Sequence, residues 1–255
     1  MPTLTHRQNQ ITEIARSEGF IGIEDIAVRL DVTPQTIRRD IKLLCDMGIL
    51  HRYHGGASLM TNTRNRDHAL RQGEMATEKA RIGEMVAAHI PDGASLFLNI
   101  GTTAEAIARA LLSRKALRVV TNNINVVTLL SQREDFDIII AGGQVRVRDL
   151  AVVGEATLGF INQFKVDFGI IGISGIDEDG TLLDFDYREV QVAQAIIANS
   201  RTTFLATDHT KFGRRAMVKL GHLDDIDGLF IDTLPPAPFS DLLEKANVSV
   251  HVVAP

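Results

Sequence analysis

The chain has 255 residues, of which 45% are hydrophobic and 23% charged, and its formal net charge at pH 7 is −5. These values are typical of a globular protein with one large domain, alone or with a smaller one, and they exclude a disordered chain. No apolar run approaches the roughly 20 residues of a membrane span, and the N-terminal residues lack a secretion-signal pattern, so we expect a cytoplasmic protein. The single cysteine, Cys45, excludes an internal disulfide and predicts a buried structural thiol.

The charges are unevenly distributed along the chain. Residues 1–60 hold seven Lys+Arg and seven Asp+Glu, so the remainder carries the whole −5. Residues 34–56 contain four basic and two acidic residues, a local charge of about +2. This balance excludes a diffuse nucleic-acid-coating surface and predicts that any binding to phosphates is confined to a small, salt-sensitive patch.

The first part of the chain predicts three helices. Thr5 and Gln8 are spaced as in a capping box, from which an amphipathic helix follows. Residues 23–30 repeat the amphipathic pattern in a second, short helix, and residues 31–33 form a turn before a third helix. A short helix, a three-residue turn and a further helix are the plan of a helix-turn-helix, whose last helix enters the major groove of DNA.

The third helix, residues 34–44, carries the strongest functional signal. Thr33 is suited to cap it, and Pro34 occupies the first helical position, where a missing N–H costs nothing. Apolar residues recur on one face at intervals of four and three residues, which leaves a cationic, hydrogen-bonding face outside. The residues of this segment expected to contact DNA are Thr33, Gln35, Thr36, Arg38, Arg39 and Lys42.

Residues 49–57 alternate as a strand does and end in two glycines, which predicts a β-wing. Arg52 and His54 are placed there to reach the DNA backbone. The two histidines of this stretch lack cysteine or carboxylate partners at ligand spacing, so we predict no metal site. The alternative for the whole N-terminal segment is a small helical protein-binding module.

The remaining chain predicts a second domain. Residues 58–78 are polar and without a clear apolar period, which indicates a linker between a DNA-binding domain, residues 1–57, and a larger domain, residues 79–255. From residue 80, helix-like and strand-like runs alternate. Continuous apolar runs such as residues 137–141 are typical of strands covered on both faces, so the predicted fold is α/β, with a mainly parallel sheet between helices.

In such folds ligands bind at the carboxyl ends of the strands, and these ends are polar and glycine-rich here. Residues 101–103 lead into a helix N-terminus, where free N–H groups and hydroxyls favour an anion such as phosphate. One such strand end usually marks only a tight turn, whereas five together predict a pocket. The other four strand ends are residues 121–123, 141–143, 172–177 and 207–213.

The carboxylates at residues 184–189, with Lys211 later in the chain, fit two purposes. Carboxylates and a lysine around a phosphate are what an aldose-ketose isomerase requires, as a base and as a cation for the enediolate. Alternatively, Asp184 and Asp186 cap the helix that follows, and Glu189 is a first-turn acid facing the helix dipole. The residues alone leave both interpretations open.

Several of these motifs resemble the DeoR family of bacterial transcriptional repressors. In the N-terminal part the resemblance rests on Arg7 and on residues 32–41 and 52–57. It implies a winged helix-turn-helix followed by an effector-sensing domain similar to the sugar-phosphate isomerase fold. The matching motifs of that second domain are residues 101–103, 121–123, 141–143, 154–155, 175–177, Glu189 and residues 211–213.

The resemblance further implies a repressor that binds a phosphorylated inducer without turning it over, with no cofactor. Residues 168–177 and 186–190 favour sn-glycerol 3-phosphate, although Asn99 stands where the family pattern leads us to expect aspartate. The expected effector site comprises Asn99, Gly101, Thr102, Thr103, Thr121, Asn122, Asn123, Gly142, Gly143, Asp177, Glu189 and Lys211.

Two expectations complete the interpretation of the sequence. Because the basic patch is small, firm operator binding requires paired heads, so we expect a homo-oligomer, either a dimer or a tetramer. The alternative function is a sugar-phosphate isomerase fused to a regulatory DNA-binding head.

Overall fold

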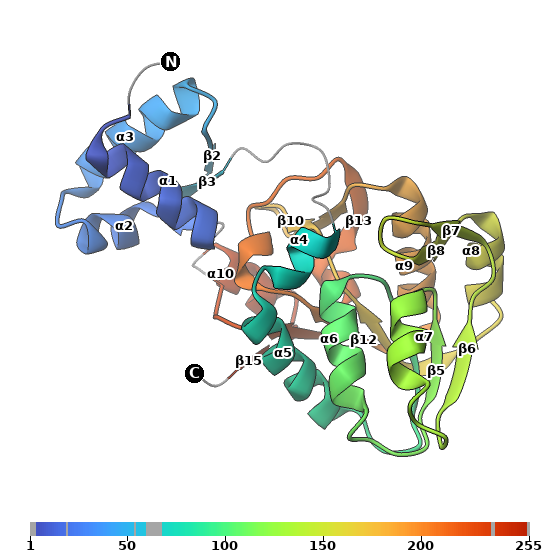
Figure 1. Cartoon of the computed structure of the whole chain (residues 1–255). Coiled ribbons are helices and arrows are strands. Elements are labelled where there is room, and N and C mark those ends of the chain that lie inside the picture. Colours follow the sequence, from blue (N-terminus) through green and yellow to red (C-terminus); the bar gives the residue numbers. More distant parts are fainter. Residues whose placement is uncertain (1–3, 19, 54, 60–67, 236–237, 254–255) are drawn as a thin grey trace.

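The computed structural model describes residues 4–18, 20–53, 55–59, 68–235 and 238–253. Figure 1 shows a small N-terminal domain, in blue, beside a larger C-terminal domain. In the described part of the chain, no helix has both the length and the apolar character needed to cross a membrane.

The N-terminal domain contains the three predicted helices, α1 (His6–Glu18), α2 (Ile23–Arg29) and α3 (Pro34–Asp46). The capping box forms, since Thr5 N donates to Gln8 Oε1 at 3.0 Å and Gln8 N donates to Thr5 Oγ1 at 3.2 Å. Thr33 Oγ1 accepts from the backbone N–H of Thr36 at 3.3 Å, and Pro34 occupies the first turn, as predicted. The apolar faces of the three helices meet in one core that includes Ile11 and Ile37.

The predicted wing is a three-stranded sheet in the order β1-β3-β2, with β1 (Phe20–Gly22), β2 (Leu50–Tyr53) and β3 (Gly56–Leu59). The sequence predicted one strand where the structure has a hairpin. Gly55 takes φ +86° at the turn, and a Cβ on Gly56 would lie 2.2 Å from the carbonyl oxygen of Ile21. The two glycines therefore permit the turn and the close approach of β1, respectively.

The C-terminal domain is built on a seven-stranded sheet in which every neighbouring pair is parallel. Its strand order is β15-β14-β12-β9-β4-β5-β6. The strands are β4 (Ser95–Leu98), β5 (Arg118–Thr121), β6 (Asp137–Ile140), β9 (Val166–Ile171), β12 (Ser200–Ala206), β14 (Gly228–Ile231) and β15 (Ser249–Val252).

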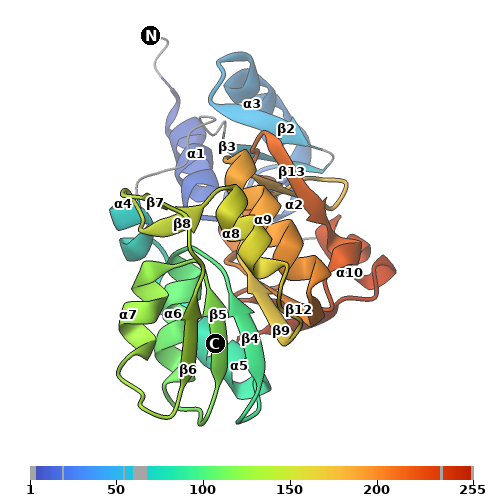
Figure 2. The same ribbon diagram turned by 90° about the vertical axis from the view of Figure 1, so that its right-hand side faces the viewer.

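Helices cover both faces of this sheet, as Figure 2 shows. On one face lie α5 (Ala76–His89), α6 (Thr102–Leu111) and α7 (Ile124–Leu130), and on the other α8 (Glu155–Ile161), α9 (Tyr187–Ala198) and α10 (Phe239–Lys245). Successive residues of a strand point to opposite faces of the sheet and belong to different hydrophobic cores. Leu96 and Leu98 of β4 pack towards α5–α7, whereas Phe97 packs towards α8–α10. The predicted parallel α/β sheet is confirmed, with the period of two that strands impose.

Strand β6 departs from the prediction that its apolar run is covered on both faces. It lies at the edge of the sheet, Ile138 and Ile139 are only partly buried, and Ile140 is 41% exposed. An unbroken apolar run therefore did not distinguish an edge strand from a central one.

The sequence interpretation also missed several short elements. Two of them are a hairpin, β7 (Gln144–Arg146) with β8 (Ala151–Val153), and helix α4 (His68–Gly73), which lies within the stretch predicted to be a linker. The others form a small antiparallel sheet and two 3-10 turns: β10 (Gly175–Ile176), β11 (Thr181–Asp184), β13 (Val218–His222), η1 (His209–Lys211) and η2 (Leu223–Asp225). Strands β7, β8 and β10 and the two 3-10 turns span only two or three residues each, too few to show a hydrophobic period.

Candidate DNA-binding surface and effector pocket

Helix α3 presents the predicted cationic face to solvent. Gln35, Arg38, Arg39 and Lys42 are exposed, whereas Thr36 is half-buried and its hydroxyl lies 2.9 Å from that of Thr33. The face projects from the start of the helix, where unpaired backbone N–H groups also favour phosphate. This arrangement is that of a helix able to enter a major groove.

Asp40 on the same helix points inwards instead. It is 5% exposed, and it accepts from Arg7 Nε at 2.5 Å and from Gln8 Nε2 at 3.3 Å. Asp40 therefore ties α3 to α1 and does not oppose the outer cations, although the sequence-based charge balance counted it against them. On the outer face, Arg38 Nη2 pairs with Glu24 Oε1 at 3.0 Å.

Three further residues of the N-terminal domain were singled out in the sequence: Arg52, His54 and Cys45. Arg52 is exposed on β2, whereas His54 lies outside the described residues. Cys45 is half-buried, not buried as predicted, and its partial burial raises the pKa of the thiol. Among the described residues, no group of three or more His, Cys, Asp or Glu is arranged to hold a metal ion.

The candidate effector pocket lies where the strand order of the large sheet reverses. From β4 the chain proceeds outwards through β5 and β6, and it returns with β9 on the other side of β4 before continuing through β12. Such a switch point leaves a crevice beyond the carboxyl ends of its two strands. The pocket is lined there by the residues after β4, from Asn99 to Thr103, and after β9, from Gly172 to Ser174.

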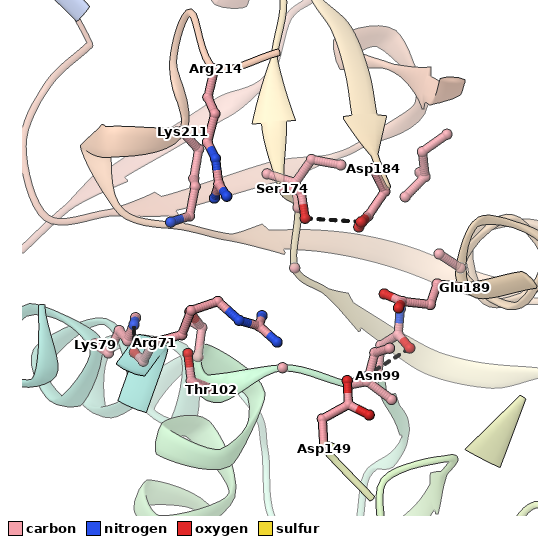
Figure 3. A pocket seen from close by; sticks show the side chains of 17 residues that line it. Arg71, Lys79, Asn99, Thr102, Asp149, Ser174, Asp184, Glu189, Lys211 and Arg214 are labelled. Atoms are coloured by element: carbon pink, nitrogen blue, oxygen red, sulfur yellow. Dashed lines mark hydrogen bonds between the residues drawn. The ribbon is translucent and has the colours of Figure 1, made fainter. Parts of the chain in front are cut away.

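The charged residues of the pocket are separated by sign. In Figure 3, Arg71, Lys211 and Arg214 lie in the left half of the pocket, whereas Glu189 and the uncharged Asn99 lie in the right half. Of the predicted effector residues, the pocket brings together Asn99, Gly101, Thr102, Thr103, Glu189 and Lys211. Further lining side chains are Arg71, Lys79, Asp149, Ser174, Asp184 and Arg214.

The cationic end of the pocket contains Lys79, Lys211 and the N-terminus of α6. Lys211 Nζ lies 3.3 Å from Asp208 Oδ2, but burial lowers the pKa of Lys211 despite this carboxylate, and Arg214 adds to the lowering. Burial also lowers the pKa of Lys79 to about 8, and Lys211 contributes although Asp208 opposes it. Gly101 precedes α6 with φ +116°, and Gly101, Thr102 and Thr103 line the same pocket at the start of the helix. This end is suited to bind a phosphate.

The acidic end is organised by Asp184 and Glu189. Ser174 Oγ donates to Asp184 Oδ1 at 2.9 Å, and burial raises the pKa of Asp184. Burial, then the charge of Asp184, raises the pKa of Glu189 to about 7, against the opposing effect of Arg146, whose guanidinium bonds Glu189 directly. Of the two aspartates expected to cap the helix, Asp186 does so by accepting from the backbone N–H of Arg188 at 3.0 Å. Asp184 does not cap it, because it ends β11 and accepts from Ser174 and from the backbone N–H of Phe185.

The structure places six predicted effector residues outside the pocket: Thr121, Asn122, Asn123, Gly142, Gly143 and Asp177. The three at the end of β5 and directly after it are buried and form hydrogen bonds within the protein. Thr121 Oγ1 donates to Leu98 O at 2.6 Å, Asn122 Nδ2 donates to Val152 O at 3.1 Å, and Asn123 caps α7.

The other three are held by local structure. Gly142 O accepts from Thr157 Oγ1 at 3.0 Å. A Cβ on Gly143 would lie 2.3 Å from Thr157 Oγ1. Asp177 closes the turn between β10 and β11 by accepting from the backbone of Glu178 and Gly180. These polar strand ends form turns, which is the more common purpose of such residues.

Lys79 is a pocket residue that the sequence signals but that we did not predict. It shares the buried face of α5 with Ile82, Gly83 and Val86, and it is 5% exposed. A lysine at an apolar-face position is rarely buried without a purpose. Arg71 had no comparable signal, because it lies in a stretch without an apolar period.

Comparison with known proteins gives two matches that together span most of the chain. The model of the DeoR C terminal sensor domain matches residues 74–233, and that of the DeoR-like helix-turn-helix domain matches residues 7–63. The chain belongs to the DeoR family. It is a DNA-binding transcriptional repressor whose larger domain is a DeoR-type sensor, so the fold predicted from the sequence is confirmed.

Two relatives are similar over nearly their whole length. The glycerol-3-phosphate regulon repressor of Escherichia coli is 46% identical, over 97% of this chain and 98% of its own. That of Haemophilus influenzae is 48% identical, over 94% and 93%. Among solved structures, a ribose 5-phosphate isomerase from Methanocaldococcus jannaschii matches 54% of this chain and 55% of its own, at 14% identity and a TM-score of 0.39.

Proposed function

We propose that the chain represses glycerol-catabolism genes and leaves its operator when sn-glycerol 3-phosphate occupies the sensor pocket. The observation that carries this proposal is the separation of charge in the pocket, where cations face carboxylates across one cavity. A small polyol with a phosphate at one end has the matching polarity. The two similar relatives are glycerol-3-phosphate regulon repressors, which supports this ligand.

The two ends of the ligand have distinct partners in this proposal. The phosphate lies at the α6 N-terminus, against Thr102 and Thr103, with Lys211 as its counter-charge. The hydroxyls lie towards Glu189 and Asn99. Asn99 Oδ1 already accepts from the backbone N–H of Ile100 at 2.8 Å, so its amide NH2 is the group available to a hydroxyl oxygen.

Release from the operator follows from linkage. The inducer shifts the repressor only by the difference between its affinities for the operator-binding and the released conformations. The exposed cations of α3 form a small patch, so we propose that two such helices in a homo-oligomer contact one operator. A conformational change that alters their spacing would then lower operator affinity.

Titration calorimetry tests the ligand. We expect glycerol 3-phosphate to bind, inorganic phosphate to bind more weakly at the same cationic end, and glycerol to give no heat. Bound ligand should raise the unfolding temperature by mass action. Equal binding of glycerol 3-phosphate and inorganic phosphate would contradict hydroxyl recognition, and no binding of either would contradict the phosphate site.

A second candidate, a sugar-phosphate isomerase, is favoured by one observation. Glu189 has a pKa of about 7, where a general base is most effective, and it lies in the same pocket as Lys211. Against this, Arg146 bonds the Glu189 carboxylate directly. We propose binding without turnover. Incubation with pentose and hexose phosphates should give no product, and turnover that disappears in Glu189→Gln and Lys211→Met would establish the enzyme instead.

A further inference from the structure

Helix α4 brings an arginine into the pocket from the segment that joins the two domains. It is the first described element after β3, and residues 60–67 connect the two in the chain. In Figure 3 the Arg71 guanidinium points into the pocket towards the space below Lys211 and Arg214. Its buried Nε has no hydrogen-bond partner within the described ranges. A buried N–H without an acceptor is costly, and an anion in the pocket would supply one.

Polar contacts hold α4 against the sensor domain. His68 Nε2 and Gln72 Nε2 lie 2.7 and 2.9 Å from the two carboxylate oxygens of Glu105, a residue of α6 that is 1% exposed. Lys79 Nζ donates to the carbonyl oxygens of Arg71 and Glu74 at 2.6 and 2.7 Å, and so covers the carboxyl end of α4. Helix α4 is thus bound to the same α6 whose N-terminus faces the pocket.

The charges of the pocket make the docking of α4 sensitive to an anion. Arg71 lies in one pocket with Lys79, Lys211 and Arg214, and these cations repel one another. The effect is visible in the lysines, since Arg71 contributes to lowering the pKa of both after the larger effect of burial. A phosphate bound among the four cations attracts each of them, so that attraction to the anion opposes their mutual repulsion. Of the four cations, Arg71 alone lies on α4, so the gain on phosphate binding favours docking of this helix.

An open cleft borders α4 on another side. It is lined by Gln72 of α4, Ala76 of α5 and Arg109 of α6, and it shares Lys79 and Thr102 with the effector pocket. The helix therefore has space beside it into which it can shift.

We propose that Arg71 binds the inducer phosphate and that α4 transmits occupancy of the pocket to the DNA-binding domain. The inference rests on the proposed function, since it assumes a phosphorylated inducer. A ligand that binds more tightly when α4 is docked favours the docked position by the same factor. The connection from β3, residues 60–67, ends where α4 begins, so docking of α4 fixes the position of that end of the connection.

The test compares the wild type with Arg71→Met and with a matched control, Arg81→Met, which removes an exposed arginine of the neighbouring helix α5. Calorimetry gives the affinity for glycerol 3-phosphate, fluorescence anisotropy gives release from a labelled operator, and hydrogen exchange follows the α4 amides. We expect Arg71→Met to bind glycerol 3-phosphate about tenfold or more weakly. At saturating ligand it should remain on the operator, and ligand should protect its α4 amides less than those of the wild type or Arg81→Met.

The outcomes separate this inference from the proposed function. Full release of Arg71→Met at saturating ligand, or equal protection of α4 in the variant and the wild type, would overturn the inference. Absence of binding to the wild type would contradict the proposed inducer, and inorganic phosphate would then serve as the probe of α4 protection. If Arg71→Met loses operator affinity in the absence of ligand, Arg71→Lys, which keeps the charge, is the second variant and should retain release.

Discussion

Phe20 of strand β1 packs edge-on against Phe239 of helix α10, with ring centroids 5.6 Å apart and planes at 89°. Phe239 in turn lies 4.9 Å from the ring of Phe212, which follows Lys211 in the chain. Phe20 is 7% exposed and belongs to the apolar core of the sensor domain. A side chain of the DNA-binding domain is therefore buried in the domain that holds the pocket, two rings away from a pocket loop.

Removing this ring should uncouple the two domains. We predict that Phe20→Ala costs about 3 kcal/mol of stability, as buried Phe to Ala changes do, and that calorimetry then resolves two unfolding transitions. Phe164→Ala is the control, because Phe164 is partly buried in the sensor domain and its ring contacts Phe160 at 5.1 Å. A single transition in Phe20→Ala with the wild-type midpoint would show that the contact does not link the domains.

The outer face of α3 should govern operator affinity. We predict that Arg38→Ala and Arg39→Ala each weaken operator binding by about 1 to 3 kcal/mol, the usual value of a base contact, with little change in thermal stability. Glu24→Gln should strengthen binding slightly, because Glu24 pairs with Arg38 at 3.0 Å on an exposed surface and competes with DNA. Fluorescence anisotropy with a labelled operator measures all three. Unchanged affinity in both arginine variants would contradict the assignment of the recognition helix.

Asp40 should matter for folding instead. Asp40→Ala removes the acceptor that binds Arg7 and Gln8 of α1, so we predict a fall in the unfolding temperature of the DNA-binding domain by several degrees. Arg38→Ala on the opposite face is its matched control and should leave that temperature almost unchanged. Equal melting temperatures of Asp40→Ala and the wild type would contradict a structural purpose for this carboxylate.

Inducer affinity should depend on pH above neutrality. Glycerol 3-phosphate stays a dianion from pH 7 to 9, since its second pKa is near 6. Burial lowers the pKa of Lys79 to about 8, so this lysine is charged below pH 8 and neutral above it. We predict that affinity falls up to about tenfold as the pH rises through 8. Lys79→Met should bind more weakly at pH 7 and show a smaller fall in affinity across pH 8, because it lacks the group that loses its charge there.

Periodicity predicted the regular parts of this fold because those parts bury a face. The seven strands of the large sheet and the six helices on it each carry a recognisable apolar run or apolar period in the sequence. Helix α4 and hairpin β7-β8 do not, and they supply Arg71 and Arg146, two of the groups that define the pocket and its carboxylates.

The expectation that polar residues at the carboxyl ends of the strands form a pocket was correct for some strands and wrong for others. It pointed to Thr102 at the switch point, but it also included Asn122, two strand positions away from β9, where the same polar residues only close turns. Strand order decides which strand ends meet, and the sequence does not contain that order in any local pattern.

The most direct test of the account is a titration of the operator-bound protein with glycerol 3-phosphate, followed by fluorescence anisotropy, for the wild type and Lys211→Met. We predict that glycerol 3-phosphate releases the wild type while glycerol does not. Lys211→Met should bind the operator as the wild type does and require at least about ten times more glycerol 3-phosphate for release. A wild type that stays on the operator at saturating ligand, or a variant released at the same concentration, would contradict control of DNA binding by this pocket.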